Sequence, residues 1–316
     1  MAHPLRTWLL ATLAAHVFGE YVNEAADPLF LQVALETRGR AAHDLVLMHI
    51  PYNFGHTIEE VAFAGSGSLD TFSYALGVVE GPLSLLSKQE RLADAMQPNG
   101  ELWGRLRPNL HVKSEVTGCP IYFTPPKYWP PALAEAYFGN KTVFGMLRDP
   151  YERLVAQFRG NYADYGGNFP EFYETCDVDG AVKSMMQTYL SGDKYAEGCT
   201  YVPQAEYFDP PYGITLAVDN LHFPDSANKV FLDHGYSNLR IATQDILHVD
   251  GCNEVWAGDL SCETKALVRK VYARDFELIC KYFGRCDENA NTCLELVPTM
   301  CPSNLTAKKA TATYCA

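Results

Sequence analysis

Two short segments of the chain carry residues that could hold an anion. The first is a glycine-containing loop whose members are Tyr52, Asn53, Phe54, Gly55, His56 and Thr57. If a helix begins there, its unpaired N–H groups and partial positive charge attract anions, and the Thr57 hydroxyl can add a donor. The alternative for this loop is a turn with a purely structural role. The second segment holds Arg148, whose guanidinium could bind a phosphate or instead pair with Asp149 or Glu152.

Each of these segments lies between a predicted strand and a predicted helix. Residues 44–50 are apolar enough for a buried strand, and a capping-box pattern that begins at Thr57 predicts the start of a helix. Residues 141–147 predict a second strand, and Asp149 is expected to cap a helix that begins at Pro150. Because this unit occurs twice, we expect an α/β fold with a mainly parallel sheet and helices on both faces.

The remaining elements are predicted from weaker patterns. Strands are expected over 109–116, 121–124 and 238–243, helices over 83–96 and 263–283, and loops over 65–68 and 125–131. In the long helix 263–283, apolar spacing predicts a buried side formed by Leu267, Val271, Leu278 and Tyr282, and Gly284 is expected to end the helix.

The cysteines indicate an oxidising compartment. The chain of 316 residues has ten of them, and none forms a CxxC pair, which argues against a cysteine zinc site. Five lie between Cys280 and Cys315, so residues 285–316 are interpreted as a disulfide-stapled tail. Because five is odd, at least one of these must pair outside this stretch or stay free.

The N-terminus and the charge point to the same compartment. Arg6 precedes a mostly apolar run over 8–18 that is too short to span a bilayer, so a signal peptide is predicted within residues 1–25; a buried first helix is the alternative. Sequons at Asn140 and Asn304 agree with secretion. The net charge of −13 disfavours nucleic acid and favours a neutral or small acceptor. We expect membrane contact only through an uncleaved leader.

The two loops resemble motifs of the membrane-type carbohydrate sulfotransferases. Residues 48–57, MHIPYNFGHT, are similar to the 5′-phosphosulfate loop of that family, and residues 144–154, FGMLRDPYERL, to its 3′-phosphate motif. Residues 202–208, 239–245 and 271–278 resemble further family segments in the same order. The resemblance spans about 44–284. It implies a P-loop-like (sulfotransferase) three-layer fold with a central parallel sheet over 40–284, followed by the disulfide-rich tail.

The resemblance also implies an activity. Members of the family transfer a sulfonate group from PAPS (3′-phosphoadenosine 5′-phosphosulfate) to a hydroxyl or amine and release PAP. The expected acceptor is a glycan or a small molecule, the expected location is the Golgi lumen or outside the cell, and no metal is required. By this resemblance the cofactor would be held by residues 52–57, by Arg148 and by the neighbourhood of Ala156.

The chain departs from the family at positions that matter for the chemistry. Tyr52 stands where the family has a lysine, and Ala156 where it usually has a serine, so Arg148 with Arg153 or Arg159 would have to hold the 3′-phosphate. His56 could supply positive charge if it is protonated.

No residue matches a general-base motif of the family cleanly. The candidate bases are His56, His111 and Glu59, and His56 is preferred because of its place in the loop. The alternative to an enzyme is a sulfotransferase-fold protein that only binds a ligand. A nucleotide-dependent kinase is disfavoured, because the Walker A pattern is absent.

Overall fold

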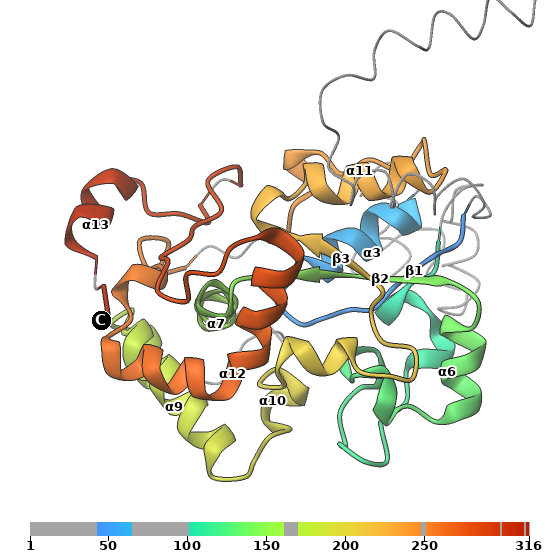
Figure 1. Ribbon diagram of the computed structural model, residues 1–316, viewed down its shortest axis with the longest axis horizontal. Helices are drawn as coiled ribbons and strands as arrows, with labels where there is room; N and C mark the ends of the chain where they lie inside the picture. The colour runs from blue at the N-terminus through green and yellow to red at the C-terminus, as the bar shows by residue number, and fades with distance from the viewer. Residues whose placement is uncertain are drawn as a thin grey trace, which may run out of the picture. The chain divides into compact units, whose positions relative to one another are not determined.

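The computed structural model describes residues 43–64, 101–160, 170–247, 251–297, 299–312 and 314–315. Figure 1 shows these residues as a coloured ribbon. The predicted leader 1–25, the loop 65–68 and the helix 83–96 lie outside the described residues.

The strands form a small parallel sheet, as the sequence predicts. Strands β1 (Leu45–Leu47), β2 (Thr142–Leu147) and β3 (Leu216–Asp219) lie in the order β1-β2-β3. Both pairings are parallel, and Phe144 of β2 pairs with Leu47 of β1 and with Leu216 of β3. Every residue of β1 and β2 is buried. Because all three strands run the same way, the segments that follow them meet at one edge of the sheet.

Helices hold many more of the described residues than strands do. The α-helices are α3 (Gly55–Ala64), α6 (Pro131–Phe138), α7 (Pro150–Arg159), α8 (Pro170–Tyr173), α9 (Val178–Leu190), α10 (Ala196–Cys199), α11 (Asp225–Asp233), α12 (Cys262–Phe283) and α13 (Leu305–Thr311). Short 3-10 turns cover 104–106, 108–110, 121–123, 126–128, 204–208, 220–222, 243–245 and 257–259. The class is therefore mixed α/β.

Local signals set several helix ends. The Asp149 carboxylate accepts hydrogen bonds from the N–H groups of Tyr151 (2.9 Å) and Glu152 (3.1 Å), which confirms the predicted cap of α7. Gly284 ends α12 with a φ of 70°, as predicted. Helix α3 is confirmed, but it begins at Gly55. The capping box does not form, because the Thr57 hydroxyl accepts from Leu247 N at 3.0 Å instead.

Three predicted strands are wrong. Segments 109–116 and 121–124 form turns and short 3-10 helices; one isolated antiparallel bridge joins Lys113 with Pro120, and Ile121 N donates to the Val112 carbonyl at 2.8 Å. Segment 238–243 runs from a turn into the 3-10 helix 243–245, and the main chain of Ile241 bonds to the Asn228 side chain instead of to a strand. Strand β3 was missed. Segment 125–131 holds one 3-10 turn before α6 begins at Pro131.

The buried side of α12 also differs from the prediction. Leu267, Val271 and Leu278 are half-buried and Tyr282 is exposed. The buried residues are Thr264, Lys265, Val268, Tyr272, Asp275, Phe276 and Ile279. An apolar pattern could not find this side because it includes polar residues whose partners are supplied from elsewhere in the chain.

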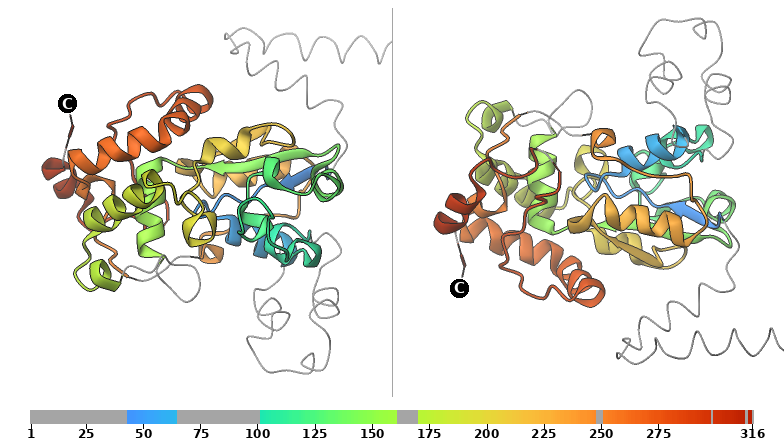
Figure 2. Two further views of the ribbon diagram at one scale, coloured as in Figure 1. Left: turned by 90° about the horizontal axis from the view of Figure 1, so that it is seen from below. Right: turned by 90° about the horizontal axis from the view of Figure 1, so that it is seen from above.

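Two hydrophobic cores stabilise the structure. One surrounds the sheet and includes Met48, Ile58, Trp103 and Phe144. The other lies among α7, α9 and α12, with Tyr151 and Phe158 at its centre. Figure 2 shows these three helices gathered at one side of the strands. Because α7 starts directly after β2, the hydrogen-bonding groups at its N-terminus are held between the two cores.

All ten cysteines form disulfides. The pairs are Cys119–Cys199, Cys176–Cys252, Cys262–Cys315, Cys280–Cys286 and Cys293–Cys301. The pairing of Cys315 with Cys262 confirms that one cysteine of the C-terminal group pairs outside it. Five disulfides are compatible with a secretory or lumenal protein. None of the helices in the described ranges is both long and apolar enough to cross a bilayer.

Candidate functional site

The two predicted anion loops lie in contact at the edge of the sheet. The loop after β1 turns sharply through Tyr52 and Phe54, whose φ angles of 65° and 59° are left-handed, and α3 begins directly after it. Arg148, the first residue after β2, donates from Nη1 to the Tyr52 carbonyl at 2.9 Å. Its guanidinium carbon lies 5.4 Å from the centre of the Phe54 ring. The fold thus brings together segments that are 96 residues apart.

Gln204 joins the two loops from a third segment. Its side-chain oxygen accepts from Asn53 Nδ2 at 2.6 Å and from the Arg148 N–H at 3.0 Å. Its side-chain nitrogen donates to the Arg148 carbonyl at 2.7 Å. Asn53 also donates to the Met146 carbonyl at 2.8 Å. Gln204 is fully buried, so these hydrogen bonds fix the loops against each other away from solvent.

Asp275 of α12 holds Gln204 in place. Its carboxylate accepts from the Gln204 N–H at 3.0 Å, from the Ala205 N–H at 2.8 Å and from Gln204 Nε2 at 3.2 Å. Burial raises the pKa of Asp275, and these hydrogen bonds oppose the rise. Gln204 and Asp275 both lie in segments that resemble segments of the sulfotransferase family, but no sequence pattern predicts a contact between them.

Arg148 is buried, and nearby negative charge balances its positive charge only in part. Its Nε lies 3.6 Å from Glu152 Oε2 and has no hydrogen-bond partner among the described residues. Burial lowers the pKa of Arg148, and the negative charges of Glu152 and Asp149 oppose this effect. Glu152 is therefore the ion-pair partner, whereas Asp149 caps α7. One buried donor of Arg148 remains available for another acceptor.

The carboxyl groups beside Arg148 are themselves perturbed. Burial raises the pKa of Asp149 to about 7, and the neighbouring Glu152 adds to the rise. Burial also raises the pKa of Glu152, against the pull of Arg148. Both carboxyl groups therefore hold a proton more readily than exposed carboxyl groups do.

Arg153 has a structural role. Its guanidinium donates to the carbonyls of Pro51 (3.1 Å), Val202 (3.1 Å) and Thr200 (2.7 Å). It therefore braces the loop after β1 from behind. Arg159 likewise donates to the carbonyls of Thr299 and Met300 and to Asn253. The structure thus engages both auxiliary arginines with other parts of the chain.

Tyr52, at the position of the family's lysine, is a neutral donor. Burial raises the pKa of its phenol far above the ordinary value, and the positive charge of Arg153 opposes this only in part. The buried hydroxyl has no hydrogen-bond partner among the described residues. Gly160 leaves room for the ring, since a Cβ there would lie 2.8 Å from Tyr52 Cε1.

His49 is a site residue that the sequence did not indicate. Its Nδ1 lies 2.6 Å from Glu59 Oε1, and the ring covers Gly55 so closely that a Cβ there would lie 2.4 Å from Nε2. Glu59 also accepts from the N–H and Nε of Arg105, both at 3.1 Å. Glu59, a candidate base, is thus fully buried in an ion pair. Nothing in the local pattern connects His49 with Glu59.

His56 lies beside His49 under an aromatic cover. Their ring centres are 4.7 Å apart, and Phe123 packs 4.8 Å from His49 and 5.8 Å from His56. Burial, with His49 and Arg105, lowers the pKa of His56 well below its usual value. His56 is therefore neutral at pH 7 in this structure, and the positive charge expected from its protonation is not supplied.

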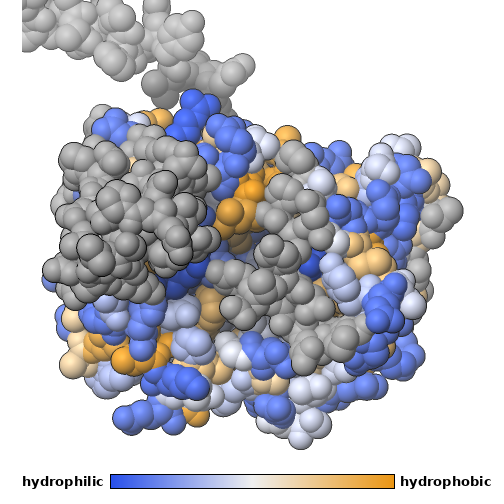
Figure 3. All heavy atoms as spheres, turned by 180° about the vertical axis from the view of Figure 1, so that it is seen from behind, coloured by the Kyte–Doolittle hydropathy of each residue, from blue (hydrophilic) through white to orange (hydrophobic). Residues whose placement is uncertain are grey.

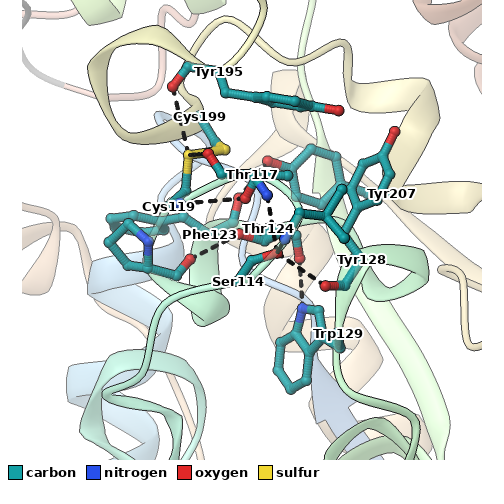
Figure 4. The surroundings of a disulfide bond; sticks show 12 residues. Ser114, Thr117, Cys119, Phe123, Thr124, Tyr128, Trp129, Tyr195, Cys199 and Tyr207 are labelled. Carbon is teal, nitrogen blue, oxygen red and sulfur yellow. Dashed lines mark hydrogen bonds between the residues drawn. A yellow bond between two sulfur atoms is a disulfide. The ribbon is translucent and has the colours of Figure 1, made fainter.

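The Cys119–Cys199 disulfide anchors the segment that carries this cover. Figure 4 shows Phe123 near the disulfide, with its carbonyl accepting from the Tyr207 hydroxyl at 2.7 Å. The next residue, Thr124, accepts from Trp129 Nε1 through its carbonyl at 2.7 Å. These contacts hold the segment that places Phe123 against the two imidazoles.

The remaining predicted site residues lie farther from the loop contacts. Ala156 is half-buried in the second turn of α7, and its carbonyl accepts from Gly160 N at 2.8 Å. His111 is exposed, with Nε2 bonded to the Arg105 carbonyl. Ala156 is linked to Tyr52 through Gly160, and His111 is linked to Glu59 through Arg105.

Comparison with protein-family models, with curated proteins and with solved structures finds no match for this chain.

Proposed function

We propose that this chain transfers a sulfonate group from PAPS to a hydroxyl or amine of a glycan or small-molecule acceptor. The observation that carries the proposal is the hydrogen bond from Arg148 to the Tyr52 carbonyl, which joins the two loops that resemble the phosphate-binding motifs of sulfotransferases. The same resemblance leads us to propose a P-loop-like sulfotransferase arrangement around the sheet and a Golgi-lumenal or secreted location.

The available polar groups fit an anionic ligand. The N-terminus of α3 supplies unpaired N–H groups and partial positive charge at Gly55. Arg148 adds a buried N–H without a hydrogen-bond partner, and Tyr52 adds a buried hydroxyl in the same state. PAPS would supply the sulfonate group and a phosphate leaving group. The chain's part would be to orient these anions and to exclude water.

The differences from the family at the proposed donor site determine how tightly we expect PAP to bind. Tyr52 can donate one hydrogen bond to a leaving oxygen, but it carries no charge there. Arg153 donates to three main-chain carbonyls, so Arg148 would provide most of the side-chain charge. We therefore expect weaker PAP binding than a complete lysine-containing loop would give.

A specific observation favours a second candidate function. Arg148 already has Glu152 as a buried counterion, which offsets charge that a phosphate would otherwise use. A sulfotransferase-fold protein that binds a ligand or partner without transferring sulfonate is consistent with this pairing and with the neutral Tyr52.

Calorimetric titration with PAP tests the proposed function. The wild-type chain should bind one PAP, and Gly55→Ala should abolish binding, because the new Cβ would meet the His49 ring at 2.4 Å and displace the loop. Arg148→Gln should also abolish binding while it keeps much of the side-chain volume.

The matched control is Arg274→Ala, which removes an exposed arginine paired with Asp209. It should leave PAP binding unchanged. Thermal unfolding of each variant checks that it is folded. A folded wild-type protein that does not bind PAP would overturn the proposed function.

A further inference from the structure

Three side chains at the start of α3 converge as metal ligands do. His49, His56 and Glu59 each offer one ligand atom, and these atoms all lie within 4.8 Å of one another. His56 and Glu59 are three residues apart on one side of α3, and His49 reaches them from the segment just after β1. Two imidazoles and one carboxylate form a common ligand set for zinc and other transition metals.

The surrounding structure keeps this cluster compact and buried. His49 and Glu59 are 2% and 0% exposed. Two glycines make room for them, since a Cβ on Gly104 would lie 1.8 Å from Glu59 Oε1 and a Cβ on Gly55 would lie 2.4 Å from His49. Phe123 packs against both imidazoles and supplies an apolar cover. Burial beneath an aromatic ring suits a small ion better than a bulky substrate.

The outer contacts of Glu59 are those of a metal-bound carboxylate. Arg105 donates from Nε to Oε2 and from its main-chain N–H to Oε1, and Oε1 also faces His49 Nδ1. Hydrogen bonds to the second oxygen of a ligating carboxylate orient it and tune the metal. Arg105 also pairs with Glu60, so two buried carboxylates share one guanidinium here. A divalent cation would balance this surplus of carboxylates.

We propose that His49, His56 and Glu59 bind a divalent transition metal of the zinc class. Nitrogen ligands disfavour magnesium and calcium, which prefer oxygen. The 2.6 Å hydrogen bond between His49 Nδ1 and Glu59 Oε1 would be replaced, with both atoms turning onto the ion and the His49 proton carried on Nε2, so that the ligand is a neutral imidazole. All ten cysteines are in disulfides, so no thiolate of this chain competes for the metal.

The place of the cluster suggests what the metal does. It lies against Gly55 in the loop where Tyr52 replaces the family's lysine, so an ion there would restore positive charge near the bound anion. This role rests on the proposed function. Metal binding itself does not.

The test uses the full disulfide-bonded chain, first treated with a chelator. Calorimetric titration with Zn²⁺ should show one site per chain, and Co²⁺ should give the visible absorption of a low-coordinate cobalt centre. His56→Ala should weaken Zn²⁺ binding by more than about 100-fold, because loss of an outer-shell partner alone costs about 10- to 100-fold. Its folding is checked by thermal unfolding without metal.

The matched control is His222→Ala, which removes an exposed histidine that pairs with Asp219. It should leave Zn²⁺ affinity unchanged. If His56→Asn is used because the alanine variant does not fold, the same loss is expected. Absence of Zn²⁺ binding, or wild-type affinity in a folded His56 variant, would overturn the proposal.

A PAP titration of the metal-free and zinc-loaded chain separates the two proposals. Zinc binding without PAP binding would leave the metal site standing and overturn the proposed function. PAP binding without zinc binding would leave the proposed function standing and overturn the metal site. If both bind, zinc should tighten PAP binding; equal PAP affinities with and without zinc would overturn the role assigned to the ion.

Discussion

Replacing Gln204 by alanine should destabilise the protein strongly, because this side chain joins the two loops. Four hydrogen bonds disappear. Some of the groups that made them keep another hydrogen-bond partner, and others do not. Asn53 keeps the Met146 carbonyl, and Asp275 keeps two main-chain N–H groups. The N–H and the carbonyl of Arg148 lose the partners described for them. At about 1–3 kcal/mol for each unsatisfied buried group, the free energy of unfolding should fall by about 4 kcal/mol.

Urea unfolding at neutral pH measures this change. The slope with denaturant should stay the same as in the wild type, so that the shift in midpoint reports stability alone. The control is Gln187→Ala on the exposed side of α9, for which we expect a change within about 0.5 kcal/mol. A loss below about 1 kcal/mol for Gln204→Ala would refute the inference that this residue holds the loops together.

Three further predictions test other parts of the structure. The native pKa of Asp149, about 7, lies above its unfolded value, so the native state binds the extra proton and stability should fall as pH rises from about 4 to about 7. Asp149→Asn keeps the cap and should reduce this loss, measured by urea unfolding at about pH 5 and about pH 8. Arg153→Met leaves three carbonyls without a donor and should lower the unfolding free energy by about 3 kcal/mol or more in the same assay. Removal of the Cys119–Cys199 disulfide, with a sequence separation of 80, should cost about 4.5 kcal/mol in chain entropy, against about 2 kcal/mol for Cys280–Cys286 with a separation of 6, as compared by urea unfolding of the two double-alanine variants.

Each of these has an outcome that contradicts it. An unchanged pH slope in Asp149→Asn would show that its buried carboxyl does not titrate as described. A loss below about 1 kcal/mol in Arg153→Met would mean that water or rearrangement satisfies the three carbonyls. Equal losses for the two disulfides would show that loop entropy does not set their contribution.

The sequence predicted the parts of the site that depend on local signals. The apolar runs that became β1 and β2 and the cap at Asp149 are all encoded within a few residues. The adjacency of Tyr52 and Arg148 followed from parallel strand pairing, because the ends of parallel strands meet at one edge.

Contacts between distant segments could not be predicted in this way. Gln204 and Asp275 are 71 residues apart, and their hydrogen bonds depend on where α12 packs. Burial of Lys265 and Asp275 contradicts the rule that apolar residues face inward, because Asn291 and the Gln204 segment supply their partners. Strand β3 was missed because most of its residues are only half-buried and give no clear apolar pattern.

The charge of His56 shows a second limit. Its ordinary pKa made protonation beside phosphates reasonable, but the structure buries the ring next to His49 and Arg105. Whether a histidine carries a proton depends on such neighbours and cannot be derived from its place in a loop.

The surface adds little to the choice of acceptor. Among the coloured residues of the face shown in Figure 3, hydrophilic ones predominate, and the hydrophobic ones occur in separate small groups. The acidic composition leads us to expect a neutral or small acceptor and not a sulfated polymer.

The most direct test of the central claim is consumption of PAPS. The wild-type chain is incubated with PAPS and a panel of neutral glycans and small alcohols or amines, and PAP is measured by chromatography. We expect acceptor-dependent PAP formation that disappears in Arg148→Gln and persists in Arg274→Ala. PAP formation that is unchanged in a folded Arg148→Gln variant, or no PAP formation and no PAP binding by the folded wild type, would contradict the assignment of the two loops as a sulfonate-donor site.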